Sequence, residues 1–241
     1  MKLARMPDGS PEIFYTLQGE GRNTGRPSIF IRSSLCNLHC RWCDTDYTWN
    51  WEDTDFVHES SRKYKREEQI IDFSIGEIVE SVSQFPCSNF VLTGGEPLIQ
   101  EKAWAELMTA ISGQFEVETN GTLLPSDAFL ERVDQINVSP KLKNSGIDPA
   151  LRLKPDVLKE LVATENADFK FVVDDKSDFE EIQALCEAVV IPAHRIFLMP
   201  KANSVAELEA NQDFVAGLAQ KHGLNYSDRL HLRLFGAKRG V

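Results

Sequence analysis

Short apolar segments rich in β-branched and aromatic residues recur along the chain, and they constrain its fold more than any other feature. They lie at residues 28–32, 90–93, 115–119, 135–138, 169–173, 195–199 and 230–235. Segments of this length and composition are typical of buried strands and too short for ordinary helices. The sequence therefore predicts a strand at each of these positions.

Helical patterns with recognisable start signals lie between several of these strands. Three pairs have the spacing of a capping box: Ser74 with Glu77, Ser177 with Glu180, and Ser204 with Glu207. Gly223 is suited to end the last of these helices. Strands that alternate with helices predict a parallel sheet with crossover helices.

Polar motifs follow the first four predicted strands at the point where each strand ends. Cys36 follows the first strand, and the others are Gly94-Gly95-Glu96-Pro97, Glu118-Thr119-Asn120-Gly121 and Ser139-Pro140-Lys141. The carboxyl ends of parallel strands meet at one edge of a sheet, and ligands bind there in barrels and in open α/β sheets. We therefore expect a single active face.

The number of strands sets the architecture. Six or seven strands are too few to close an eight-stranded barrel, so we expect an α/β fold with a partial TIM-type barrel of about six parallel strands. The whole chain, residues 1–241, is expected to form one domain. Residues 48–73 do not fit the alternation and are interpreted as an insertion after the cysteine segment. This segment ends with a basic cluster: Arg62, Lys63, Lys65 and Arg66.

Composition excludes several classes of function. A net charge of -11 disfavours binding to nucleic acid, because a polyanion needs a basic face. No apolar run approaches the roughly 20 residues of a membrane span, and the first ten residues lack the apolar core of a signal peptide. We therefore expect a cytoplasmic protein that acts on a small molecule and binds neither nucleic acid nor membrane.

Three of the five cysteines lie within eight residues, as Cys36, Cys40 and Cys43 with C-x3-C-x2-C spacing. Three thiolates can hold three irons of a [4Fe-4S] cubane and leave the fourth iron open, whereas electron-transfer clusters use four ligands. The alternative is a zinc site that His39 or Asp44 completes. Cys87 and Cys186 stand alone and are interpreted as small buried residues.

The surroundings of these cysteines resemble those of radical S-adenosylmethionine enzymes. That family places an aromatic residue, here Trp42, before the third cysteine, and a Gly-Gly-Glu-Pro motif holds the methionine amino group. Gly94 and Gly95 are also compatible with a simple turn. In the cofactor interpretation their missing side chains let the backbone approach the ligand, and Glu96 accepts hydrogen bonds from an ammonium group.

A narrower resemblance covers most of the chain. It rests on Leu17-Gln18-Gly19-Glu20-Gly21, Arg32, Cys43-Asp44-Thr45, Thr93 and the three strand-end motifs named above. Together they resemble the 7-carboxy-7-deazaguanine synthase family. The resemblance implies conversion of 6-carboxy-5,6,7,8-tetrahydropterin to 7-carboxy-7-deazaguanine with loss of ammonia, on the route to queuosine and other 7-deazapurines. It also implies an incomplete barrel and a homodimer.

The resemblance assigns ligands to particular residues. The pterin would be held by Leu17, Gln18, Gly19, Glu20, Arg32 and Thr93, with the C-terminal carboxylate of Val241 within reach. S-adenosylmethionine would be held by Trp42, Asp44, Gly95, Glu96, Ser139, Pro140 and Lys141. Thr45 would bind Mg²⁺. His231 fits a substrate contact, a core residue or a surface residue equally well.

Two other functions fit parts of the sequence. A glycyl-radical-enzyme activase has the same cysteine spacing but needs a large protein substrate, and a zinc-stabilised interaction module needs no catalysis. The basic cluster at residues 62–66 fits the docking of an acidic flavodoxin-type electron donor, or else a solvated basic surface.

Overall fold

The computed structural model describes all residues from 1 to 241 and contains one open, ten-stranded sheet. The strands are β1 (Lys2–Ala4), β2 (Ile13–Leu17), β3 (Pro27–Ser33), β4 (Ile70–Asp72), β5 (Asn89–Gly94), β6 (Gln114–Thr119), β7 (Gln135–Val138), β8 (Ala167–Val173), β9 (Ile196–Pro200) and β10 (Asn225–Tyr226). Their order is β10-β9-β8-β7-β6-β5-β3-β1-β4, and β2 pairs with β3. The sheet does not close, because β10 and β4 lie at its opposite ends.

The pairing is mostly parallel, as the sequence predicts. Neighbours from β3 through β5, β6, β7, β8 and β9 to β10 are parallel, while β1, β2 and β4 join in antiparallel fashion. The α/β class with a mostly parallel sheet is therefore confirmed, and the open sheet is consistent with an incomplete barrel.

The predicted strand at 230–235 is wrong, because these residues form the helix α9 (Leu230–Phe235). The short apolar run suggested a buried strand, but Leu232 is buried whereas Leu234 is 51% exposed. The short strand β10 occupies the position beside β9 instead. Residues after it turn away from the sheet and pack on the loop that follows β2, where the backbone N–H of Leu230 donates to the carbonyl of Gly19 (2.9 Å).

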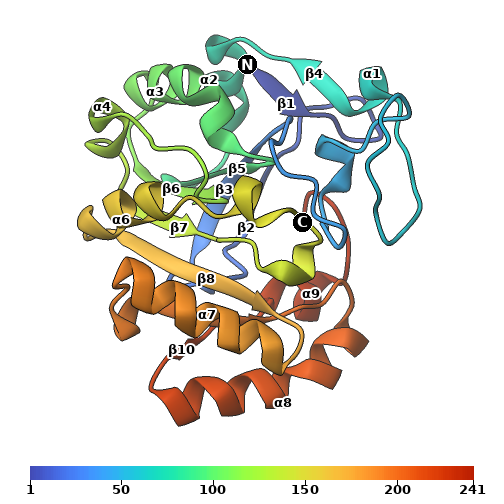
Figure 1. Cartoon of the computed structure of the whole chain (residues 1–241). Coiled ribbons are helices and arrows are strands. Elements are labelled where there is room, and N and C mark those ends of the chain that lie inside the picture. The colour runs from blue at the N-terminus through green and yellow to red at the C-terminus, as the bar shows by residue number, and fades with distance from the viewer.

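The other helices are α1 (Arg66–Gln69), α2 (Ile75–Ser83), α3 (Glu101–Ala110), α4 (Asp127–Leu130), α5 (Pro149–Arg152), α6 (Pro155–Ala163), α7 (Lys176–Val189) and α8 (Val205–His222). Helices α2, α3, α6, α7 and α8 form an arc that runs from above the strands, past their left side, to below them (Figure 1).

Two of the three predicted helix starts are confirmed. Ser74 and Glu77 form a reciprocal capping box, and the Ser204 hydroxyl accepts a hydrogen bond from the N–H of Glu207. Helix α7 instead begins after Asp175, whose carboxylate accepts from the N–H groups of Ser177 and Asp178. The prediction of a Ser177 cap was wrong because a stronger acceptor lies two residues earlier, where a negative charge also complements the helix dipole. Gly223 ends α8 in the left-handed conformation, as expected.

The parallel strands divide their side chains between two faces. The outward residues are apolar and form one core with the helices: Ile29, Ile31, Phe90, Leu92, Phe115, Val117, Ile136, Val138, Phe169 and Phe171. The intervening residues point to the inner face of the curved sheet and are mostly polar: Arg32, Thr93, Glu116, Glu118, Asn137, Asp168 and Lys170. Helices thus cover one face, and polar groups gather on the other.

Residues 48–73 have a defined structure. Trp51 and Tyr64 form an isolated parallel bridge, and β4 at the end of the segment pairs with β1. His58 Nε2 lies 2.9 Å from the carbonyl oxygen of Cys43, and the N–H of Glu59 donates to the carbonyl of Arg41 (2.7 Å). The segment therefore packs directly on the cysteine-bearing loop.

None of the helices combines the length and apolar character needed to cross a membrane.

Candidate active site

The loop at residues 34–45, here called the cluster loop, leaves the carboxyl end of β3 and carries the three clustered cysteines. Burial raises the pKa of Cys40 to about 12, and it also raises the pKa values of Cys36 and Cys43. Buried thiols of this kind stay protonated unless a positive centre stabilises the thiolates, as bound iron does. The donor set therefore suits a metal cluster better than a free reactive thiol.

The two residues that could complete a zinc site are engaged elsewhere. The His39 ring stacks on Phe56 with 3.4 Å between centroids, and burial together with the charge of Lys63 lowers its pKa to about 4. The Asp44 carboxylate pairs with Arg229. No three of the histidine, cysteine, aspartate and glutamate side chains converge on one point as ligands of a single ion must. A cubane is larger than an ion and needs no such convergence.

The polar groups beside Cys43 also indicate whether this site suits an iron–sulfur cluster. The Thr45 hydroxyl lies 3.5 Å from Cys43 Sγ, and the buried indole N–H of Trp49 has no oxygen or nitrogen partner. Burial raises the pKa of Cys43, while the hydrogen bond with the Thr45 hydroxyl opposes that rise. Because hydrogen bonds to cluster sulfurs are a common feature of iron–sulfur sites, these donors fit a cluster-bound thiolate.

The loop after β5 packs against the cluster loop so closely that side chains are excluded. Gly94 has a φ of +147°, and a Cβ on Gly95 would lie 2.2 Å from the carbonyl oxygen of Leu35 and 2.9 Å from Cys36 Cβ. Backbone N–H groups of Gly95 and Glu96 donate to the carbonyls of Ser33 and Leu35. The glycine pair thus fixes the position of the cluster loop, in addition to its predicted contact with cofactor.

Glu96 is fully buried and connects two strand ends. Its carboxylate accepts from the Thr119 hydroxyl (2.9 Å) and from the N–H groups of Asn120 (2.7 Å) and Leu98 (3.0 Å). Burial raises its pKa despite these bonds. Asn120 also donates to Asn37 Oδ1 on the cluster loop (2.9 Å). Sequence reasoning missed Asn37, although it lies next to Cys36, and the cofactor contact of Glu96 stays a prediction.

The other predicted cofactor residues lie at the same edge of the sheet. Trp42 Nε1 donates to Asn144 Oδ1 (3.2 Å), and Lys141 Nζ lies 5.8 Å from the centre of the Trp42 ring. Lys141 also donates to the Ser139 hydroxyl (2.9 Å), and Pro140 lies between them in the loop after β7. The structure therefore brings these side chains together, although their ligand remains a prediction.

Gln18 follows β2 and extends into the polar inner face. Its amide N–H group donates to Glu116 and, at 3.4 Å, to Glu118. Thr93 donates to the other oxygen of Glu118 (2.7 Å). Sequence reasoning missed Glu116, because a single charge within a strand suggests solvent exposure. The alternation along β6 was the signal that could have placed it beside Glu118.

Glu20 lies among buried charges that come from distant parts of the chain. Lys170 on β8 and Arg229 before α9 both pair with its carboxylate, and His231 Nδ1 lies 4.0 Å away. Burial alone would raise the pKa of Glu20, but the charges of Lys170 and Arg229 hold it well below its usual range. Gly19 is required here, since a Cβ would lie 2.4 Å from His231 Nδ1.

Arg32 and the C-terminal tail meet at Glu12. The buried Glu12 carboxylate accepts from Arg32 Nε (3.0 Å), Arg239 Nη2 (2.7 Å) and the Tyr47 hydroxyl (3.0 Å). Arg239 thereby fixes the last residues of the chain near Arg32, two positions before Val241. The substrate contacts expected of Arg32 and Val241 stay predictions, and sequence reasoning named neither Glu12 nor Arg239.

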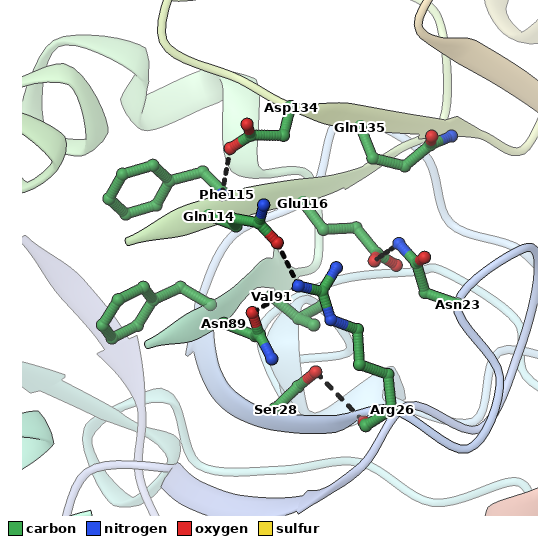
Figure 2. A pocket seen from close by; sticks show the side chains of 11 residues that line it. Asn23, Arg26, Ser28, Asn89, Val91, Gln114, Phe115, Glu116, Asp134 and Gln135 are labelled. Carbon is green, nitrogen blue, oxygen red and sulfur yellow. Dashed lines mark hydrogen bonds between the residues drawn. The ribbon is translucent and has the colours of Figure 1, made fainter. Parts of the chain in front are cut away.

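The cavity in Figure 2 lies at the opposite, amino ends of β5, β6 and β7. Asn23, Arg26 and Gln114 are among its lining residues, and Asn23 donates to Glu116 (2.6 Å). Its volume of about 20 Å³ is sufficient for a single water molecule. It is far too small for a pterin and lies away from the cysteine motifs.

The class of protein to which this chain belongs follows from a match to a known superfamily. Residues 30–163 match the model of the Radical SAM superfamily, so the chain belongs to that superfamily of enzymes. The crystal structure of QueE from Escherichia coli superimposes with a TM-score of 0.66, covering 96% of this chain and 95% of that one at 22% identity. At this identity, the likeness supports the fold alone.

Curated relatives then give the particular family. A 7-carboxy-7-deazaguanine synthase of Pyrobaculum aerophilum is 35% identical over 233 residues, with 95% of each chain covered. That of Halobacterium salinarum is 36% identical, with 93% of this chain and 89% of the relative covered. The chain belongs to the 7-carboxy-7-deazaguanine synthase family.

Replacing Gly95 with alanine should disturb the cluster loop, because the new Cβ would overlap the Leu35 carbonyl. We expect Gly95→Ala to retain several-fold less iron after anaerobic reconstitution while its circular dichroism is unchanged. Gly217→Ala, where nothing lies within 4 Å of the added Cβ, is the matched control and should keep its iron. Equal iron contents in the two variants would contradict the packing role of Gly95.

Proposed function

We propose that this chain converts 6-carboxy-5,6,7,8-tetrahydropterin to 7-carboxy-7-deazaguanine with release of ammonia, as a carbon–nitrogen lyase in the synthesis of queuosine and related 7-deazapurines. One observation carries the proposal: Gln18 and Glu20 share the inner face of the sheet with Thr93, and Arg229 joins Glu20 to Asp44 of the cluster loop. The names of the curated relatives, which are 7-carboxy-7-deazaguanine synthases, support the same product.

The cofactor would be held at the carboxyl edge of the sheet. Cys36, Cys40 and Cys43 would ligate a [4Fe-4S] cluster, which when bound supplies the electron for reductive cleavage of S-adenosylmethionine. The remaining contacts are proposed for Trp42, Asp44, Gly95, Glu96, Ser139, Pro140 and Lys141. Hydrogen bonds hold the loops after β5 and β6 against the cluster loop, so that part of this set is fixed in place.

The pterin would be recognised by paired polar groups. A flat heterocycle with N–H and C=O edges needs carboxylate and amide partners, which Glu20 and Gln18 supply, while Arg32 would meet its carboxylate. Gln18 is fully oriented before substrate binds, because Glu116 and Glu118 both accept from its amide N–H group. An analogue that lacks a matching group would leave one of these buried groups unpaired and bind more weakly.

Anaerobic turnover tests the proposed function. The reconstituted protein should release ammonia and 7-carboxy-7-deazaguanine in equal amounts, with many products per 5'-deoxyadenosine, because the reaction is a net rearrangement and elimination. Cys40→Ala should lose both cluster and product, whereas Cys186→Ala should retain both. Absence of the deazaguanine, or wild-type turnover by Cys40→Ala, would overturn the proposal.

We also propose Mg²⁺ as a cofactor, bound through the Thr45 hydroxyl. The ion would orient the substrate carboxylate and neutralise charge during the reaction. Thr45→Ala should lose the stimulation of turnover by Mg²⁺ while keeping its iron. Thr45→Ser keeps a hydroxyl group and should therefore keep the stimulation. Thr109→Ala, on the exposed side of α3, is the control. An unchanged Mg²⁺ response in Thr45→Ala would remove this residue from the site.

A flavodoxin-type donor would dock on the basic cluster at residues 62–66. These four side chains are exposed, and the segment that carries them packs on the cluster loop through His58. Three have local partners: Lys63 donates to the carbonyl of Thr54 (2.7 Å), Lys65 lies 3.5 Å from Glu68, and the Arg66 guanidinium lies 5.9 Å from the Trp51 ring centre. Opposite charge would speed encounter with an acidic donor at low salt. Homodimer formation and a cytoplasmic location stay predictions.

Reversal of the four basic charges to glutamate should reduce turnover driven by reduced flavodoxin and leave turnover driven by dithionite unchanged. The loss should shrink as ionic strength rises, because screening removes the attraction. A matched variant reverses four exposed basic residues elsewhere: Arg132, Lys159, Lys176 and Lys221. Equal rates with both reductants, or the same loss in the matched variant, would exclude docking on this surface.

A further inference from the structure

Arg229 connects three loops beside the inner face, although no sequence motif identifies it. The residue precedes α9 and is 7% exposed. Its guanidinium group donates to three acceptors: Glu20 Oε1 (3.0 Å), Asp44 Oδ2 and the backbone carbonyl of Ala202. One side chain thus contacts the loop after β2, the cluster loop and the loop after β9.

The backbone around Arg229 is fixed independently of these charges. The N–H of Leu230 donates to the Gly19 carbonyl (2.9 Å), and the N–H of Gly21 donates to the Ser227 hydroxyl (2.8 Å). The absence of a Cβ on Gly19 leaves room for the His231 ring. The residues before α9 are therefore packed against the Gln18–Gly21 loop on both sides of Arg229.

The geometry of the guanidinium explains why arginine is needed here. Glu20 and Asp44 lie close enough for their negative charges to repel each other. A planar guanidinium can donate to two carboxylates and a carbonyl at once, whereas an ammonium group is a compact point charge. Lys170 contacts Glu20 but has no contact with Asp44. Arg229 is the side chain that bonds to both carboxylates.

We propose that Arg229 is a positioning residue that couples the binding of the pterin to the binding of S-adenosylmethionine. The inference rests on the proposed function, in which Glu20 contacts the pterin and Asp44 contacts the cofactor. Whichever ligand binds first orders one carboxylate and, through the shared guanidinium, the other carboxylate as well. The second ligand then meets a site that is already ordered, so each ligand should tighten the binding of the other by the same factor.

Binding measurements on the anaerobically reconstituted protein test this coupling without turnover. The dissociation constant of S-adenosylmethionine is measured without a reductant, with and without saturating 6-carboxy-5,6,7,8-tetrahydropterin, and the reciprocal titration is measured too. In the wild type, the pterin should lower this constant by about five-fold or more, at the lower end of usual allosteric couplings. In Arg229→Gln, the ratio of the dissociation constants measured without and with the pterin should fall to about one, which is the value for independent sites.

Two further variants separate positioning from general damage. Arg229→Lys keeps the positive charge but loses the planar set of guanidinium donors. It should therefore bind both ligands, with a coupling weaker than that of the wild type and stronger than that of Arg229→Gln. Arg233→Gln removes a guanidinium one turn further along α9, where it pairs with Asp228, and should keep full coupling. Iron content and circular dichroism confirm that each variant is assembled, and Arg229→Lys alone is used if Arg229→Gln does not fold.

The outcomes distinguish this inference from the proposed function. If the wild type does not bind the pterin, the proposed function fails and the inference fails with it. If both ligands bind but do not affect each other, the inference alone fails. Full coupling in Arg229→Gln, or its loss in Arg233→Gln, would also overturn the role of Arg229.

Discussion

The two-residue period of the parallel strands is the constraint on which the rest of this structure depends. Crossover helices cover one face of the sheet, so apolar residues such as Phe169 and Phe171 must point toward them, and the residues between are committed to the inner face. In β8 these are Asp168 and Lys170, both buried. The same alternation that builds the core therefore collects charges on the face where the strand-end loops meet.

These inner charges are better explained by ligand binding than by stability. Burying a charge is costly even when it is paired, and apolar substitutes often stabilise a fold as well or better. Glu20, Lys170 and Arg229 are nevertheless almost fully enclosed, and Arg229 connects the loop after β2 to the cluster loop. The network also joins the loop that carries Glu20 to the cluster loop through the guanidinium group of Arg229, so that in the proposed coupling a ligand that orders one carboxylate also orders the other.

Sequence patterns predicted those features that local chemistry determines. The cysteine loop, the Gly94-Gly95 turn and the Ser74 cap lie where they were expected, because each depends on residues close in the chain. Arg229 and Lys170 were missed, since they meet Glu20 across 209 and 150 residues and nothing in their own neighbourhood marks them. Residues 230–235 were assigned wrongly for a related reason: their alternation fits a strand, but tertiary packing on Gly19 decides their structure.

The central claim is that the pterin and S-adenosylmethionine bind side by side on this inner face, at the carboxyl edge of the sheet. An anaerobic crystal structure of the reconstituted protein with both ligands tests it most directly. We expect the pterin within hydrogen-bond distance of Gln18 and Glu20, S-adenosylmethionine beside Asp44 and Trp42, and Arg229 between them. A pterin bound away from Glu20, or two ligands bound at different faces of the sheet, would contradict the account.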